Sequence, residues 1–121
     1  MSEPIQTKRV YEPYNSDDGT RVLVERLWPR GITHERLHAD TWLREIAPTA
    51  ALRTWYAHDP AKWPEFVTRY TVQLDSQPDL VASLLEIARR GPLTLVYAAR
   101  DMEHSSALVL LNYLKDRLKT R

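Results

Sequence analysis

The chain has 121 residues, no cysteine, and 17 Lys and Arg against 16 Asp and Glu, so its formal net charge is +1. This length predicts one domain over residues 1–121. The absence of cysteine excludes a disulfide framework, thiolate zinc and iron–sulfur clusters, and a cysteine nucleophile. The near-neutral charge argues against a general binder of nucleic acids or acidic membranes, because such proteins usually carry a large basic excess.

The start of the chain and its apolar runs bear on location. Residues 1–4 have neither the basic start nor the apolar core of a signal peptide. No apolar run approaches the roughly 20 residues that are needed to span a bilayer. We therefore expect a cytoplasmic protein that makes no membrane contact.

Three segments have the apolar pattern of β-strands, near residues 5–11, 21–28 and 93–98. The first leads into a loop rich in turn-forming residues. The second contains an uninterrupted apolar run, which suits a strand covered on both faces, and it ends at Pro29 because proline cannot donate to a ladder. The third is the clearest strand signal in the chain.

Five helices are predicted, near residues 40–47, 49–57, 60–75, 79–90 and 104–119. The clearest begins at Asp59 and Pro60, a cap residue and a first-turn proline, and its apolar residues recur at spacings of three and four. Segment 40–47 could instead be an irregular edge strand, and we favour a short helix capped by Asp40. Strands that alternate with helices predict an α/β fold with a small, mostly parallel sheet covered by helices.

In open α/β sheets, ligands bind beyond the carboxyl ends of the strands. Two loops qualify here, at residues 26–31 and 98–106. If their strands are neighbours, arginines and His104 converge on one rim beside the start of the last helix, an arrangement that suits an anion. The predicted ligand-binding residues are Arg26, Trp28, Arg30, Gly31, Tyr97 and Arg100, and the predicted catalytic residues are Asp101 and His104.

Several of these residues also have a structural interpretation. Arg26 and Arg30 could form ion pairs with nearby carboxylates, and surface pairs of that kind contribute little to stability. Trp28 could pack in the core or at its rim, because tryptophan buries a large area. Ser105 and Ser106 could simply cap the last helix.

No cofactor is predicted. His34 and His38 are the one close histidine pair, and no glutamate completes a zinc hydrolase motif around them. The three glycines of the chain lie outside any phosphate-binding loop pattern. The carboxylates near the proposed rim are Asp17, Asp18, Glu25, Asp101 and Glu103, and their order in the sequence does not tell which is desolvated enough to act as an acid or base.

Six segments carry a family resemblance that spans nearly the whole chain: residues 8–11, 18–19, 21–31, 42–48, 52–53 and 93–99. The most specific of them is Arg-Leu-Trp-Pro-Arg-Gly at residues 26–31. On these residues the chain resembles the bacterial domain of unknown function 488 (DUF488) family, in its short YeaO-like branch.

The resemblance implies a small α/β protein with a site near the exits of the second and last strands, and it supplies no activity. Longer relatives tend to carry Cys and His after the last strand, and YeaO-like members often carry Asn-His where this chain has Ser105 and Ser106. His104 is then the local substitute for an imidazole at position 106. Some members are labelled MarR-type transcription regulators, but here a strand and a helix follow Gly91 instead of a β-hairpin wing.

The sequence therefore predicts a protein that binds a small anionic ligand, phosphate-bearing or nucleotide-like, in the crevice between the two loops. Catalysis stays open, and a reaction would use acid–base or hydrolytic chemistry through a carboxylate and His104. The alternative is a non-catalytic protein-interaction module, either a monomer or a homodimer. A nucleic-acid-binding regulator ranks third.

Overall fold

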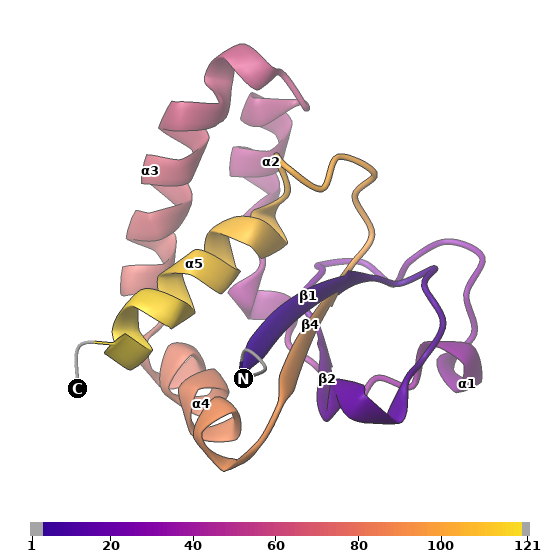
Figure 1. Ribbon diagram of the computed structural model, residues 1–121. Helices are drawn as coiled ribbons and strands as arrows, with labels where there is room; N and C mark the ends of the chain where they lie inside the picture. The colour runs from indigo at the N-terminus through magenta and orange to yellow at the C-terminus, as the bar shows by residue number, and fades with distance from the viewer. Residues whose placement is uncertain (1–3, 120–121) are drawn as a thin grey trace.

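The computed structural model describes residues 4–119, and their α/β fold is built on a four-stranded sheet (Figure 1). The strands are β1 (Ile5–Arg9), β2 (Thr20–Leu23), β3 (Thr41–Trp42) and β4 (Leu93–Tyr97). The α-helices are α1 (His34–Leu37), α2 (Ala50–Tyr56), α3 (Trp63–Asp75), α4 (Pro78–Arg90) and α5 (Ser106–Lys119), with short 3-10 helices at Ser16–Asp18, Arg44–Ile46 and Pro60–Lys62. All of these strands are parallel, in the order β1-β4-β2-β3, which confirms the predicted fold class.

The predicted helix at 40–47 is wrong, because this segment forms the edge strand β3 and then a 3-10 turn. The backbone N–H of Asp40 donates to the carbonyl of Arg21 at 2.7 Å, and that of Leu43 donates to the carbonyl of Leu23 at 3.0 Å. Pairing with the open edge of β2 therefore overrides the local helix signal. The short helix α1 was not predicted, and it begins where the Thr33 hydroxyl accepts the N–H of Arg36.

Two predicted strands are shorter than expected. β1 ends at Arg9 because the chain turns there: the Glu12 N–H donates to the Arg9 carbonyl at 3.0 Å, and the Glu12 carboxylate accepts the Arg9 N–H at 2.6 Å. β2 ends at Leu23, and the N–H of Val24 makes a last bond to the carbonyl of Val96 at 3.1 Å. The chain then leaves the sheet toward the candidate site.

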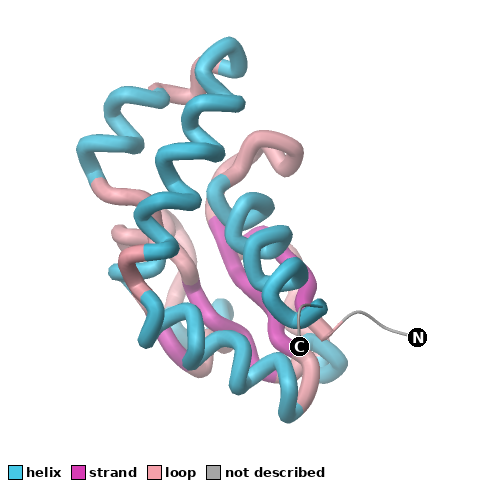
Figure 2. Tube along the Cα trace, turned by 90° about the vertical axis from the view of Figure 1, so that its left-hand side faces the viewer, coloured by secondary structure: helices cyan, strands magenta, loops and turns pink. Residues whose placement is uncertain are grey.

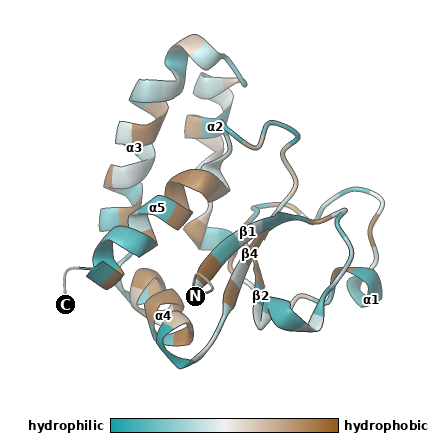
Figure 3. Cartoon of the chain, in the orientation of Figure 1, coloured by the Kyte–Doolittle hydropathy of each residue, from teal (hydrophilic) through white to brown (hydrophobic). Residues whose placement is uncertain are grey.

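The helices are divided unequally between the two faces of the sheet. Helices α2 to α5 cover one face, whereas α1 lies on the other. In Figure 2 the long helices lie in front and the strands of the sheet are seen beyond them. Hydrophobic segments of α4 and α5 lie around β1 and β4 (Figure 3). Within residues 4–119, no helix combines the length and the apolar character that crossing a bilayer requires.

Alternation along the strands builds a separate core on each face. On the helical face the buried strand residues are Ile5, Val22, Leu93, Leu95 and Tyr97, packed against α2 to α5. On the other face a smaller cluster is formed by Val10, Leu23, Ile32, Leu37 and Val96. Both faces are therefore covered, as parallel sheets require.

A buried ion pair completes the second face. Arg21 and Asp18 are 0% and 2% exposed, and the Arg21 Nη1 atom lies 2.5 Å from the Asp18 carboxylate. The rest of the guanidinium donates to the carbonyl of Leu37. Lys8 also donates to the Asp18 carboxylate, and the Thr94 hydroxyl donates to the Asp18 carbonyl. The network thus joins β1, β2, β4 and α1 through satisfied hydrogen bonds.

Replacing Asp18 tests this network. Breaking a buried pair by removing one partner typically costs about 3 kcal/mol or more, so Asp18→Asn is expected to lower the free energy of unfolding by that amount. The control is Asp17→Asn, a change at an exposed neighbour that should have little effect. Urea denaturation at neutral pH measures both, and equal losses would contradict the assigned role.

The same carboxylate makes stability depend on pH. Burial raises the pKa of Asp18, but hydrogen bonds from Lys8, Asn15 and Arg21 outweigh burial and hold that pKa below its usual value. A depressed folded-state pKa contributes stability that is present above the unfolded pKa and is lost as pH falls through the folded pKa. Asp18→Asn should therefore flatten the acid limb of a stability-against-pH curve.

Gly19 is required by both its backbone angles and its surroundings. Its φ is +67°, and a Cβ atom there would clash with the carbonyl oxygen of Pro92. Gly31 also has a positive φ, of +77°, but apart from its two chain neighbours no residue among 4–119 has an atom within 4 Å of its Cβ position. The two glycines share a conformational requirement, and only the first is also closely packed.

A pair of alanine variants separates these two effects. Gly31→Ala should cost about 1 kcal/mol, the penalty for a side chain in a left-handed conformation. Gly19→Ala should lower the free energy of unfolding by about 3 kcal/mol, because a steric clash with Pro92, the residue before β4, is added. Chemical denaturation of the two variants checks the difference, and a similar loss in both would show that the close approach is unimportant.

Candidate functional site

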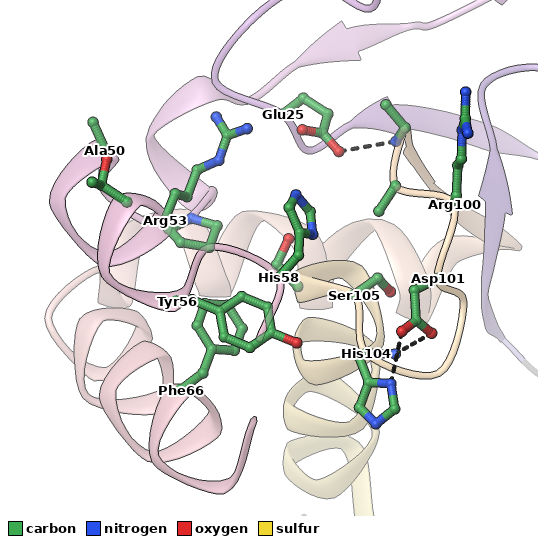
Figure 4. Close-up of a pocket in the computed structure, with 15 residues that line it drawn as sticks. Glu25, Ala50, Arg53, Tyr56, His58, Phe66, Arg100, Asp101, His104 and Ser105 are labelled. Atoms are coloured by element: carbon green, nitrogen blue, oxygen red, sulfur yellow. Dashed lines mark hydrogen bonds and ion pairs between the residues drawn. The ribbon is translucent and has the colours of Figure 1, made fainter. Parts of the chain in front are cut away.

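A pocket of about 780 Å³ lies beyond the carboxyl ends of β2 and β4. Its size is typical of small-molecule sites. The walls come from the exits of the two strands, the start and body of α2, the loop that follows α2, and the start of α5. The ionisable residues in the lining are Glu25, Arg53, Tyr56, His58, Arg100, Asp101 and His104, and all of them are labelled in Figure 4.

Glu25 ties the two strand exits together. Its Oε2 atom accepts the backbone N–H of Ala98 at 2.9 Å, and its own carbonyl accepts the indole N–H of Trp42 at 2.6 Å. Burial raises the pKa of Glu25, against the opposing effects of the Ala98 N–H and the charge of Arg53. Glu25 is therefore the desolvated carboxylate that the sequence could not single out.

Asp101 and His104 form a hydrogen-bonded pair at the start of α5. The Asp101 Oδ1 atom accepts the backbone N–H groups of Glu103 and His104, and Oδ2 lies 2.8 Å from the His104 Nδ1 atom. The bond to His104 lowers the pKa of Asp101. The ring of His104 packs edge-on against Trp63, with centroids 5.1 Å apart. The Nε2 atom of His104 takes no part in this hydrogen bond.

The cationic side chains of the pocket differ in direction. Figure 4 shows Arg53 reaching from α2 toward the side on which Glu25 lies, while Arg100 extends away from the other labelled residues. His58 follows α2 in a loop whose residues Ala57 and His58 have φ values of 47° and 57°. Such angles are uncommon for residues other than glycine, and strained backbone often marks a functional position.

An aromatic stack forms the apolar side of the pocket. The ring of Tyr56 stacks on Phe66 at a centroid distance of 4.6 Å, and Phe66 stacks on Trp63 at 5.4 Å. Ala98 and Ala99 lie in the lining as well. The pocket thus pairs a flat apolar wall with a set of charged groups.

Of the eight residues predicted from the sequence, three line this pocket: Arg100, Asp101 and His104. The other five, Arg26, Trp28, Arg30, Gly31 and Tyr97, do not line it. At the exit of β2 the residue that lines the pocket is Glu25, which precedes the 26–31 loop, and no residue of that loop lines it.

The groups of Arg26 and Trp28 that could bind a ligand are occupied by backbone carbonyls. Arg26 donates to the carbonyls of Pro48 at 3.0 Å and Ala47 at 3.3 Å. The indole N–H of Trp28 donates to the carbonyl of Ile32 at 2.7 Å. Both side chains hold loops in place. Trp28 packs against the smaller core, as its structural interpretation proposed, whereas Arg26 bonds to backbone carbonyls and not to the carboxylates proposed for it.

The remaining predicted residues lie either in solvent or in the core. Arg30 and Gly31 are exposed, and the Arg30 carbonyl accepts the hydroxyl of Tyr11 at 2.9 Å. Tyr97 is 3% exposed and belongs to the core on the helical face, where burial raises its pKa. The ligand-binding roles predicted for these residues stay predictions.

Sequence reasoning missed Arg53, Tyr56 and His58. His58 directly precedes the cap residue Asp59, and nothing local in the sequence indicates that its loop folds toward β4. Arg53 carried one signal, since it belongs to the short segment 52–53 of the family resemblance. Among residues 4–119, no group of three or more His, Asp or Glu side chains is arranged to hold a metal ion.

A family model described as "Inactive DUF488-N3 subclade" matches residues 4–121. The chain belongs to the DUF488 family. The resemblance stated from the sequence is thereby confirmed, and the family description adds the word "inactive". No solved structure gave a significant match to the chain.

Three relatives agree with this placement in the DUF488 family. Uncharacterized protein YeaO of Escherichia coli (strain K12) is 40% identical over 111 residues, or 92% of this chain and 96% of the relative. Uncharacterized protein Rv3073c of Mycobacterium tuberculosis (strain ATCC 25618 / H37Rv) is 39% identical over 113 residues, or 93% of this chain and 95% of the relative. Uncharacterized protein Mb3100c of Mycobacterium bovis gives the same values.

The Asp101–His104 pair predicts a defined histidine tautomer. An ionised carboxylate only accepts hydrogen bonds, so neutral His104 should carry its proton on Nδ1. Long-range ¹H–¹⁵N NMR spectra report this tautomer directly. Asp101→Ala should remove the preference, whereas Glu103→Ala, a change at an exposed neighbour, should keep it. A proton found on Nε2 in the unmodified protein would contradict the assignment.

Proposed function

We propose that this DUF488 protein binds a small anionic ligand, phosphate-bearing or nucleotide-like, in the strand-exit pocket and does not turn it over. Arg53 carries the proposal. Its side chain lines the pocket, and within residues 4–119 no hydrogen bond or ion pair engages its guanidinium. An arginine with five donors that the surrounding protein leaves unused is suited to bind a phosphate or carboxylate.

The start of α5 supports an anion at the same place. Ser105 and Ser106 line the pocket, and the first N–H groups of a helix have no partners within it. Ser105 caps α5 by accepting the N–H of Leu108 at 3.2 Å, so the N–H groups of Ser106 and Ala107 are the ones that face an anion. Their dipoles favour negative charge, and α5 is long enough for its dipole to develop. His58 adds a group that becomes cationic when it is protonated.

The apolar wall supports a ligand that is more than a bare anion. Tyr56, Phe66 and the alanines after β4 offer a surface on which a ring could pack, beside the charged groups. A nucleotide combines these two properties. The volume of the pocket also exceeds what an inorganic anion would fill.

Two observations support binding without turnover. The DUF488-N3 subclade to which the chain belongs is described as inactive. The chain has no cysteine, and it carries Ser105 and Ser106 where the family resemblance implies Asn-His in many members. The catalytic roles of Asp101 and His104, the cytoplasmic location and the monomeric or homodimeric state stay predictions.

Isothermal titration with adenosine 5′-monophosphate (AMP) tests the anion site. Arg53→Gln should weaken binding by about tenfold or more, because a charge-assisted hydrogen bond is lost. Arg30→Gln is the matched control, since Arg30 is exposed like Arg53 but lies outside the pocket lining. Its affinity should stay within about twofold of the unmodified value.

Two outcomes would overturn the proposal. A larger loss of AMP affinity in Arg30→Gln than in Arg53→Gln would place the anion at the 26–31 loop. No binding of AMP or inorganic phosphate by the unmodified protein would favour the interaction module, whose exposed aromatic side chains include Tyr11 and Tyr14. Turnover of a bound phosphate ester would contradict the non-catalytic part.

A further inference from the structure

Glu25 offers the pocket a hydrogen-bond acceptor that the protein does not use. Within residues 4–119 its carboxylate has one recorded partner, the N–H of Ala98 on Oε2. No fully buried side-chain oxygen or nitrogen in the described part of the chain lacks a partner, so Oε1 must be accessible. Because Glu25 lines the pocket, this atom is available there.

The surroundings of Glu25 make a ligand donor favourable. Burial raises the pKa of this carboxyl group, and the charge of Arg53 opposes the rise. No cation of residues 4–119 lies within ion-pair distance of it. A desolvated carboxylate with an open lone pair gains more from a hydrogen-bond donor than it would in water.

Arg53 and Glu25 favour two different groups on a ligand in this part of the pocket, an anion and a hydrogen-bond donor. The charge of Arg53 acts on Glu25, and Figure 4 shows its guanidinium reaching toward the side where Glu25 lies. A matching ligand therefore carries an anion and a hydrogen-bond donor a short distance apart. Phosphorylated sugars have this arrangement, because hydroxyl groups lie near the phosphate. Acidic side chains also accept hydrogen bonds from ribose hydroxyls in dinucleotide-binding folds.

We infer that Glu25 accepts hydrogen bonds from the hydroxyl groups of a phosphorylated sugar, while Arg53 binds the phosphate. The inference rests on the proposed anion binding and narrows its ligand class to sugar phosphates and nucleotides with free ribose hydroxyls. Inorganic phosphate would meet the same Arg53 but would be repelled by Glu25. Glu25 is therefore a specificity residue, which selects among anions.

Two nucleotides that differ only in the ribose hydroxyls provide the main test. The unmodified protein should bind AMP about tenfold more tightly than 2′,3′-dideoxy-AMP, the loss expected for hydrogen bonds to a charged group. Glu25→Gln should reduce this ratio to near unity. Glu35→Gln is the control, because Glu35 is an exposed residue of α1 on the other face of the sheet and should keep the full preference.

Inorganic phosphate provides a second readout with the opposite sign. Glu25→Gln removes a negative charge beside the anion site, so it should tighten phosphate binding while weakening the preference for AMP. A purely structural role for Glu25 would weaken both. The glutamine carbonyl can still accept the Ala98 N–H, and retained protection of that amide in hydrogen exchange would show that the strand exits stay joined.

The two proposals fail in different ways. Equal binding of AMP and its dideoxy analogue by the unmodified protein, with both still weakened by Arg53→Gln, would overturn the role of Glu25 and keep the anion site. Binding that Arg53→Gln leaves unchanged would overturn the proposed function and this inference with it. Weaker phosphate binding in Glu25→Gln would overturn the specificity role alone.

Discussion

A buried ion pair between Asp18 and Arg21 organises the face of the sheet that the long helices leave uncovered. Two charges removed from water are costly unless good geometry and further hydrogen bonds compensate for the lost solvation. Here the compensation is extensive: Arg21 donates to Leu37, and Asp18 accepts from Lys8 and binds Thr94 through its carbonyl. These partners come from α1, β1 and β4, and Arg21 itself belongs to β2. The ion pair therefore links three strands to the helix α1.

The candidate pocket depends on this alignment because it lies where the strands end. Glu25 joins the exits of β2 and β4 through the N–H of Ala98. Arg26 then connects the exit of β2 to the segment before α2, through the carbonyls of Ala47 and Pro48. Helix α2 carries Arg53, which lines the pocket. Charged groups from distant segments therefore meet at one edge of the sheet, and the aromatic stack of Tyr56 and Phe66 forms the wall beside them.

The elements that the sequence predicted well are those with a strong local pattern. Helices α3, α4 and α5 and strand β4 have apolar residues at regular spacings, and such a pattern reports which side will be buried. For segment 40–47 the helix was preferred over the alternative of an irregular edge strand, because the two residues of β3 form a strand only when they pair with β2. Glu25 was recognised as one carboxylate among several and was not selected, since its hydrogen-bond partner Ala98 lies 73 positions away and its burial arises only in the folded chain.

The sequence by itself determined the α/β class and the exclusion of cysteine chemistry, and it predicted a ligand site at the strand exits, where the structure has a pocket. Only the tertiary structure decided which side chains are available at that site. Arg26 and Arg53 look alike in the sequence. In the structure Arg26 donates to the carbonyls of Pro48 and Ala47, whereas Arg53 lines the pocket and its guanidinium has no hydrogen-bond partner among residues 4–119. The physical reason is that hydrogen-bond partners and the exclusion of water are set by packing between distant segments, which no local pattern encodes.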